Sequence, residues 1–246
     1  MKFLIIELPS LMKKISIIIF LLIFVPSEAQ TSIFDSLLIK NVDSTGKVDY
    51  QSFKKDELLL DEYLSYLNNN TPSKKWSANK EKAYWINTYN AYTIKLILKY
   101  YPLKSIKDIN IDGKIAWKIP LIKVGNKHYT LDGIEHKILR KKFKDPRIHV
   151  GINCAAKSCP KLWNHAFTER NIDSALDNLM LEFINAGQRN KISKNKLELS
   201  RIFDWFFNDF TKNGTLINYL NKYATIKVSK KASIKYLTYD WILNNK

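Results

Sequence analysis

Apolar and polar positions follow a helical period over most of this chain. Residues 77–100 are the clearest case, because their aromatic and aliphatic residues recur at helical spacing between Ser77, a good N-cap, and Pro102. The breadth of this apolar face predicts a central helix. Similar spacing predicts further helices at 31–42, 49–67, 132–141, 171–186 and 215–223.

Extended segments are fewer and shorter. Residues 117–124 and 127–131 flank a Gly-Asn turn, residues 191–200 resemble a small hairpin, and residues 234–243 form a strand-like tail. Arg147 to Ile152 is a run of β-type residues that leads into a small-residue turn. Residues 202–210 are aromatic on nearly every side, which predicts burial. The pattern predicts an α+β fold: a predominantly helical single domain over residues 30–246 with a small antiparallel sheet.

The first 29 residues have the pattern of a secretory signal peptide. Lys13 and Lys14 precede an apolar run from Ile15 to Val25, and the small residues Ser27 and Ala29 precede a cleavage point before residue 30. We therefore expect export to the periplasm or the extracellular space. The run is too short to span a bilayer, and no later segment is a transmembrane candidate. Translation starts at either Met1 or Met12.

The charge narrows the choice of partners. The formal charge is +17, yet only five of the 40 basic residues are arginine. Arginine is the usual side chain for reading bases and phosphates, so specific nucleic-acid recognition is not expected. Two interpretations of the charge remain: a solvated lysine-rich surface, or a weak attraction to an anionic envelope surface.

Both cysteines lie in one segment, residues 145–160, with the sequence DPRIHVGINCAAKSCP. One interpretation is a thiol nucleophile with a histidine partner. The other is a loop closed by a short disulfide between Cys154 and Cys159, which an oxidising compartment would allow.

The candidates for thiol chemistry are Cys154 as nucleophile and His136 as its base, with His149 as a further member. One of Asn87, Asn90 or Glu135 could orient the imidazole, and Asn87 is preferred. In a regular strand His149 and Cys154 would point to opposite faces, so His149 is the backup base.

Some of these residues also have purely structural interpretations. Asn87 shares a helix face with Asn90, and both could satisfy backbone groups. With Asp132 as N-cap, Glu135 occupies the third helical position and could complete a capping box; Thr130 is the alternative cap. His128, beside the hairpin turn, is expected to face solvent.

A metal centre is the weaker alternative. Glu135, His136, His149 and the thiols are zinc-type ligands, but the chain has no HxxxH or CxxC pair. It also has no serine-hydrolase elbow, phosphate loop or dinucleotide fingerprint. No cofactor is therefore expected.

Five segments, in order, resemble the DUF547 family from about residue 35 to the end: AYWINTYNAYTIKLIL, LDGIEHKILR, DPRIHVGINCAAKSCPKL, LSRIFDWFFNDF and YLTYDWILN. The resemblance implies an α+β domain built around the Asn87 helix, the Glu135–His136 helix and the Cys154 strand. It also implies a distant similarity to papain-like thiol hydrolases and transferases in a circularly permuted order.

The family pattern places glutamate, histidine, histidine and cysteine at the positions of Glu135, His136, His149 and Cys154. Plant relatives carry serine at the position of Cys159, which makes Cys154 the better nucleophile candidate.

Two functions follow as hypotheses. The first is an exported cysteine-dependent hydrolase or acyl transferase that acts on peptide or amide bonds of an unknown peptide or envelope substrate. The alternative is a non-catalytic envelope binding or structural module whose cysteines are buried or disulfide-bonded. No sequence feature indicates the oligomeric state.

Overall fold

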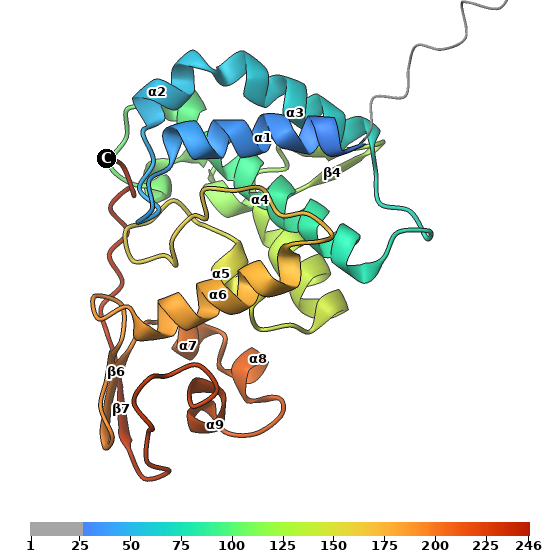
Figure 1. Ribbon diagram of the computed structural model, residues 1–246. Coiled ribbons are helices and arrows are strands. Elements are labelled where there is room, and N and C mark those ends of the chain that lie inside the picture. Colours follow the sequence, from blue (N-terminus) through green and yellow to red (C-terminus); the bar gives the residue numbers. More distant parts are fainter. Residues whose placement is uncertain (1–26) are drawn as a thin grey trace, which may run out of the picture.

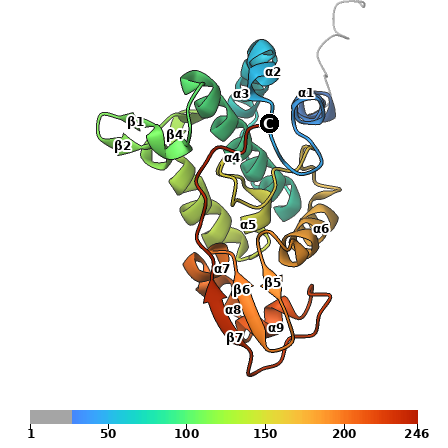
Figure 2. The ribbon, with the colours of Figure 1, turned by 90° about the vertical axis from the view of Figure 1, so that its left-hand side faces the viewer.

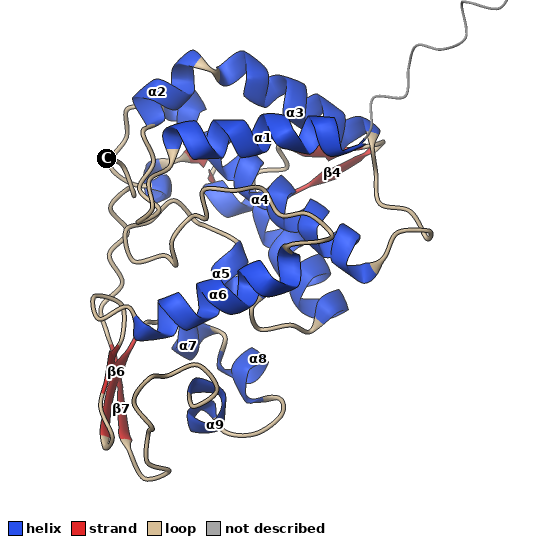
Figure 3. Ribbon diagram, viewed as in Figure 1, coloured by secondary structure: helices blue, strands red, loops and turns tan. Residues whose placement is uncertain are grey.

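The computed structural model describes residues 27–246, and side chains from residue 31 (Figure 1). Helices dominate and the strands are short, so the predicted α+β fold is confirmed (Figure 3). The α-helices are α1 (Ser27–Asn41), α2 (Tyr50–Lys55), α3 (Glu57–Asn69), α4 (Ala78–Tyr100), α5 (Ile148–Gly151), α6 (Ile172–Asn185), α7 (Ile202–Trp205), α8 (Phe207–Thr211) and α9 (Leu216–Leu220). The other helical elements among residues 27–246 are a π-helix, η4 (Gly133–Phe143), and the 3-10 turns η2 (Ile106–Asp108) and η3 (Ala116–Lys118).

Helix α4 is the centre of the molecule, as its apolar face predicted. Ser77 caps it by accepting a hydrogen bond from the Lys80 N–H, and every residue from Lys82 to Ile94 is buried. The helix packs against α2, α3, η4 and α6, which lie on different sides of it. Because it is enclosed in this way, its polar residues must find hydrogen-bond partners in neighbouring segments rather than in water.

The strands form three small sheets instead of one. Two are antiparallel hairpins, β1 (Asn110–Ile111) with β2 (Lys114–Ile115), and β3 (Ile122–Val124) with β4 (Lys127–Tyr129). The third orders β5 (Lys191–Ile192), β6 (Lys196–Leu199) and β7 (Ser233–Tyr236), and its β6–β7 pair is parallel. Both predicted hairpins are present, whereas the parallel pair depends on a long connection that local patterns do not reveal.

The strand predicted at Arg147–Ile152 is wrong, because the structure has a short helix, α5, in its place. Asp145 starts this turn: its carboxylate accepts a hydrogen bond from the Arg147 N–H. Gly151 then lies so close to α4 and α6 that an added Cβ would be 2.9 Å from Leu176 Cδ2. Tertiary packing has thus overridden the β propensity of the sequence.

Helix η4 begins differently from the main expectation. Asp132 makes no capping hydrogen bond with its side chain; instead Thr130 Oγ1 accepts from the Gly133 N–H at 2.9 Å. The Glu135 side chain is only 8% exposed, so it faces the interior. The predicted capping box is therefore absent, and Glu135 is free for another role.

The aromatic segment at 202–210 is only partly buried. Its residues divide between α7 and α8, and Trp205 and Phe207 are both 44% exposed. The expected burial is therefore wrong for these two side chains.

After β7 the chain leaves the third sheet and crosses to the opposite side of the molecule. Figure 2 shows this C-terminal strap (residues 237–246) running from β7 to the region of α1 and α2. Its main chain is bonded to the cysteine loop (residues 152–160): the Lys157 N–H donates to the Ile242 carbonyl, and the Asn244 N–H donates to the Ala155 carbonyl. The strap and the loop therefore fix each other.

Most of the predicted signal peptide, residues 1–29, lies outside the described residues. In the part of the chain that the structure describes, no helix has both the length and the apolar character needed to cross a bilayer.

Candidate functional site

The cysteine loop holds its two sulfur atoms against each other. Cys154 Sγ lies 3.0 Å from Cys159 Sγ, and the Cys154 N–H also donates to Cys159 Sγ at 3.1 Å. Both thiols are free; Cys154 is half-buried and Cys159 is buried. The loop can bend this tightly because Ala155 adopts a positive φ of 58°. The result is a thiol pair with one accessible member.

Asparagine side chains set the loop conformation. Asn153 accepts from the Ala155 N–H and donates to the Pro160 carbonyl, both at 2.8 Å. Asn90, from α4, donates to the Gly151 carbonyl at 2.8 Å and accepts from the Asn153 N–H at 2.9 Å. Each buried amide is therefore satisfied by main chain, and the central helix positions the thiols.

Asn87 does not orient an imidazole. Its amide donates to the Phe167 carbonyl at 2.7 Å and accepts from the Phe167 N–H at 3.0 Å. The structural interpretation of the sequence therefore fits Asn87, and the predicted contact with His136 is absent from the described residues.

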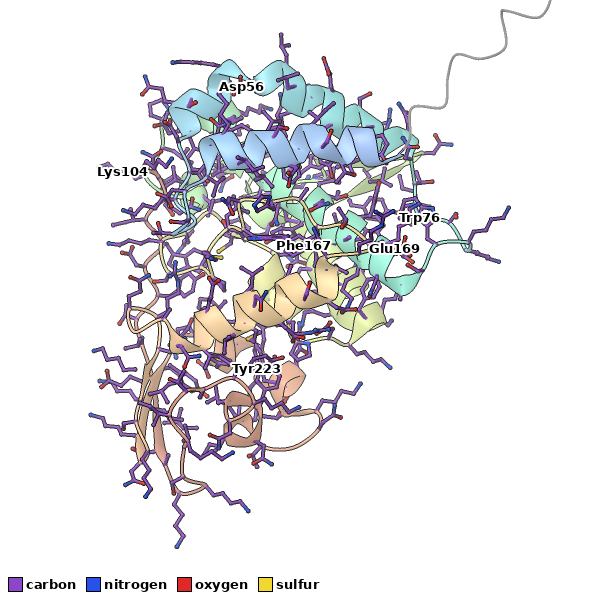
Figure 4. The ribbon with its side chains drawn as sticks, viewed as in Figure 1. Asp56, Trp76, Lys104, Phe167, Glu169 and Tyr223 are labelled. Atoms are coloured by element: carbon purple, nitrogen blue, oxygen red, sulfur yellow. The ribbon has the colours of Figure 1, made fainter. Side chains whose placement is uncertain are left out.

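The neighbourhood of Asn87 is a separate hollow. A groove of about 820 Å³ lies between α3, α4 and the segment before α6, and Asn87 is part of its wall. Figure 4 labels Trp76, Phe167 and Glu169 around it. Neither cysteine lines this groove.

The C-terminal strap contributes a hydroxyl group to the thiol pair. The Tyr239 hydroxyl lies 3.3 Å from Cys154 Sγ. Burial, and then the charges of the two sulfurs, raises the pKa of Tyr239 well above its ordinary value, so the phenol keeps its proton and can donate to a thiolate. The Tyr239 ring also contacts Trp205 and Trp241, with ring centroids 4.8 and 4.6 Å away.

His136, the base expected from the sequence, does not contact Cys154. Its Nε2 lies 3.3 Å from Asp132 Oδ1 and its Nδ1 lies 2.9 Å from Arg140 Nη1. Because an arginine always donates, Nδ1 is the acceptor and carries no proton. Burial holds the pKa of His136 below its ordinary value, which agrees with a neutral ring.

His149, the backup base, is the buried member of a partly exposed ion-pair network (His149, Asp209 and Arg140). Its Nε2 is 2.8 Å from Asp209 Oδ2, and Asp209 also accepts two hydrogen bonds from Arg140, at 2.6 and 3.0 Å. The ring stacks on Phe206 at 3.9 Å. Burial lowers the pKa of His149. In the described part of the chain no hydrogen bond joins either imidazole to Cys154.

Glu135 connects this network with the thiols. Its carboxylate is 3.9 Å from His149 Nδ1. Burial, followed by the charge of the Cys154 sulfur, raises the pKa of Glu135 to about 8. The carboxyl group is therefore within electrostatic reach of the thiol and mostly protonated at neutral pH. The Cys154 charge is thus one of the causes of the raised Glu135 pKa.

The thiols titrate as a coupled pair, joined by one S–H···S hydrogen bond. Burial opposes ionisation of Cys159, but the S–H and N–H of Cys154 outweigh it, so the pKa of Cys159 is lowered. The same S–H···S hydrogen bond, together with burial, raises the pKa of Cys154. The pair thus loses its first proton readily and its second with difficulty.

Tyr239, Asp209 and Arg140 were missed as site residues at the sequence level. Each lies in one of the segments that carry the family resemblance, which is the only signal that could have marked them. Among residues 27–246, no three His, Cys, Asp or Glu side chains come together as a metal site.

Comparison with known proteins finds a match to a family model and to nothing else. Residues 73–184 match the family model described as "Protein of unknown function, DUF547". No curated protein and no solved structure matches the chain. The matched range covers α4, η4, the cysteine loop and α6, which includes every candidate residue from the sequence.

Proposed function

Since the chain contains a DUF547 domain, whose family function is unknown, we propose that the domain is a thiol-dependent hydrolase or acyl transferase for peptide or amide bonds, with Cys154 as its nucleophile. The observation that carries the proposal is the sulfur of Cys154, a half-buried residue, 3.0 Å from a second thiol and electrostatically coupled to the buried Glu135 carboxyl group. Export, supported by the apolar run at Ile15–Val25, would place the substrate in the cell envelope.

The second thiol replaces the histidine of the expected dyad. A cysteine attacks only as its thiolate. The Cys154 S–H donates to Cys159 Sγ, so transfer of that proton to Cys159 leaves the negative charge on Cys154. The Tyr239 hydroxyl, 3.3 Å from Cys154 Sγ, stabilises this form by donating a hydrogen bond.

Glu135 has the properties of the general acid and base. An acid with a pKa near the working pH is protonated for the first step and ionised for the next. In the first step the Cys154 thiolate attacks the carbonyl carbon, the C–N bond breaks, and the Glu135 proton passes to the leaving nitrogen. In the second step the Glu135 carboxylate takes a proton from water, which attacks the thioester and releases the acid. The thiolate and the Glu135 proton are both restored.

The ion-pair network holds the Glu135 carboxylate in position. His149 is held between Phe206 and Asp209, and its Nδ1 faces the Glu135 carboxylate at 3.9 Å. Its role is to position that carboxylate, because the ring has no contact with the thiol.

The alternative is a non-catalytic binding module, and the groove near Asn87 favours it. Aromatic side chains line this groove from several elements, among them Trp76, Tyr84 and Trp163. Its volume of about 820 Å³ is within the range of small-ligand sites. In that case binding would survive the loss of Cys154.

The test is a burst experiment with a p-nitrophenyl ester. We expect a burst of nitrophenol near one equivalent, with the acyl group on Cys154 by peptide mass spectrometry. The Cys154→Ser variant should lose the burst and the adduct, while Ser158→Ala, in the same loop, should keep both. Equal hydrolysis by wild type and Cys154→Ser, with no acyl group on Cys154, would exclude the proposal and leave the binding module.

The Glu135→Gln variant separates the two chemical steps. Nitrophenol leaves without protonation, so the burst should remain, whereas the second step has lost its base. We expect the acyl-enzyme to accumulate and the steady-state rate to fall by about 100-fold. An unchanged steady-state rate would show that Glu135 takes no part in deacylation.

A further inference from the structure

The cysteine loop has the geometry of a reversible dithiol. A disulfide bond requires an S–S distance of about 2.05 Å. The sulfurs of Cys154 and Cys159 are already 3.0 Å apart, so their bonding needs a movement of roughly 1 Å. Both residues are in a loop whose backbone is fixed by Asn153 and by the C-terminal strap. The sulfurs therefore have no alternative partner as near as each other.

The two sulfurs differ in access. Cys154 is half-buried, whereas Cys159 is only 4% exposed. Cys154 is therefore the more exposed of the two cysteines. This asymmetry suits Cys154 to react with a disulfide from solution and Cys159 to complete the reaction inside the protein.

The surroundings of Cys159 suit the internal role. Its sulfur accepts the Cys154 N–H at 3.1 Å, and its carbonyl accepts a hydrogen bond from Arg189 Nε at 2.8 Å. The guanidinium charge and the N–H both favour a thiolate on Cys159. A buried thiolate beside Cys154 is positioned to attack any disulfide formed there.

We propose that Cys154 and Cys159 carry out thiol–disulfide exchange with low-molecular-weight disulfides. The Cys154 thiolate attacks one sulfur of the disulfide RSSR, and RS⁻ leaves, so a mixed disulfide forms on Cys154. The Cys159 thiolate then attacks Cys154 Sγ and expels the second RS⁻. The two protons of the protein thiols pass to the two leaving thiolates. The disulfide is reduced to two RSH molecules and the pair is oxidised, and excess RSH reverses the reaction.

The exchange goes beyond the acyl chemistry proposed above and does not depend on it. If Cys154 is also the acyl nucleophile, the oxidised protein has no thiolate to attack a substrate. The pair would then couple the activity to the redox state of the compartment.

The experiment uses glutathione disulfide with the full chain, followed by acid quenching and mass spectrometry. We expect wild type to lose two hydrogens, with Cys154 and Cys159 joined in one peptide pair, and excess glutathione to restore the starting mass. Cys159→Ser should instead accumulate one glutathione on Cys154. Cys154→Ser should gain none, because Cys159 is shielded.

Circular dichroism of each variant confirms that the fold is kept, and Cys154→Ala serves if the serine variant does not fold. A wild type that accumulates glutathione without forming the internal disulfide would overturn the proposal, as would a Cys154 variant that reacts at the wild-type rate. These masses are read without an acyl substrate, so failure of the acyl proposal would leave the result unaffected.

Discussion

Glu135→Gln is expected to stabilise the protein at pH 9 by about 3–5 kcal/mol relative to wild type, with a much smaller difference at pH 5. Burial in the folded state raises the pKa of Glu135 from 4.5 to about 8. The raised pKa contributes stability that is fully present below pH 4.5 and is lost as the pH rises to about 8. Above that, folding must bury a carboxylate. Glutamine keeps the shape of the side chain without its charge, so the stability of the variant lacks this pH dependence.

Urea unfolding at pH 5, 7 and 9, followed by far-UV circular dichroism, measures the effect. Glu62→Gln, at an exposed position of α3, is the matched control and should change the unfolding free energy by less than about 0.5 kcal/mol at each pH. If both variants follow the wild-type pH dependence, the Glu135 carboxyl group is not held protonated by its surroundings.

Asp209→Ala is expected to destabilise the protein by about 1.5–3 kcal/mol, because it removes the charged acceptor of the hydrogen bonds from Arg140 and His149. Asp209 accepts from Arg140 and from His149, whose side chain is only 1% exposed. Burial opposes its ionisation, but the hydrogen bonds from His149 and Arg140 outweigh this and hold the pKa of Asp209 well below its ordinary value. The stability from this depressed pKa is present at neutral pH and is lost as the pH falls through the folded-state pKa.

The matched control is a similar pair at the surface. Arg201 Nη1 and Asp204 Oδ2 are 2.7 Å apart, with side chains 43% and 38% exposed. Asp204→Ala should cost no more than about 1 kcal/mol, because water screens an exposed pair. Chemical denaturation at pH 7 compares the two variants. Equal, small losses would show that the Asp209 network contributes no more than a surface contact.

Local periodicity was sufficient for the central helix and both hairpins. The helical spacing of Trp85, Tyr89 and Tyr92 reflects one face of α4, although the structure buries its other faces too. The same local information failed at Arg147–Ile152. There the segment is helical, and Gly151 packs closely against Leu176, which is distant in sequence. Propensity is a weak guide where packing across the core sets the backbone.

The contacts of the candidate residues were not predictable from the sequence. Cys159 was expected beside Cys154 only as a disulfide partner, and the expected contact between Cys154 and an imidazole is absent from the described residues. His136 is adjacent to Glu135 in sequence, yet it is turned toward Asp132 and Arg140, while Glu135 faces the interior. Neighbouring residues of a helix diverge in direction, and only the packing of η4 on α4 decides which of them points inward.

The role of Asn90 shows a second limit. Asn87 and Asn90 share one face of α4, so sequence alone cannot distinguish them. In the structure Asn90 forms hydrogen bonds with the main chain of the cysteine loop, whereas Asn87 forms them with the main chain of Phe167. The choice depends on where two distant loops dock on the helix.

The C-terminal strap is synthesised after the cysteine loop that it covers. Tyr239 follows Cys154 by 85 positions, so a ribosome adding about 5–20 residues per second makes the cysteine roughly 4–17 seconds before the tyrosine. The partners of the Ala155 carbonyl and the Lys157 N–H, Asn244 and Ile242, are likewise made only when the strap is synthesised. The nascent chain therefore presents both thiols without their native cover throughout that interval. Oxidation, modification or chaperone binding during synthesis would meet the cysteines in this unprotected form.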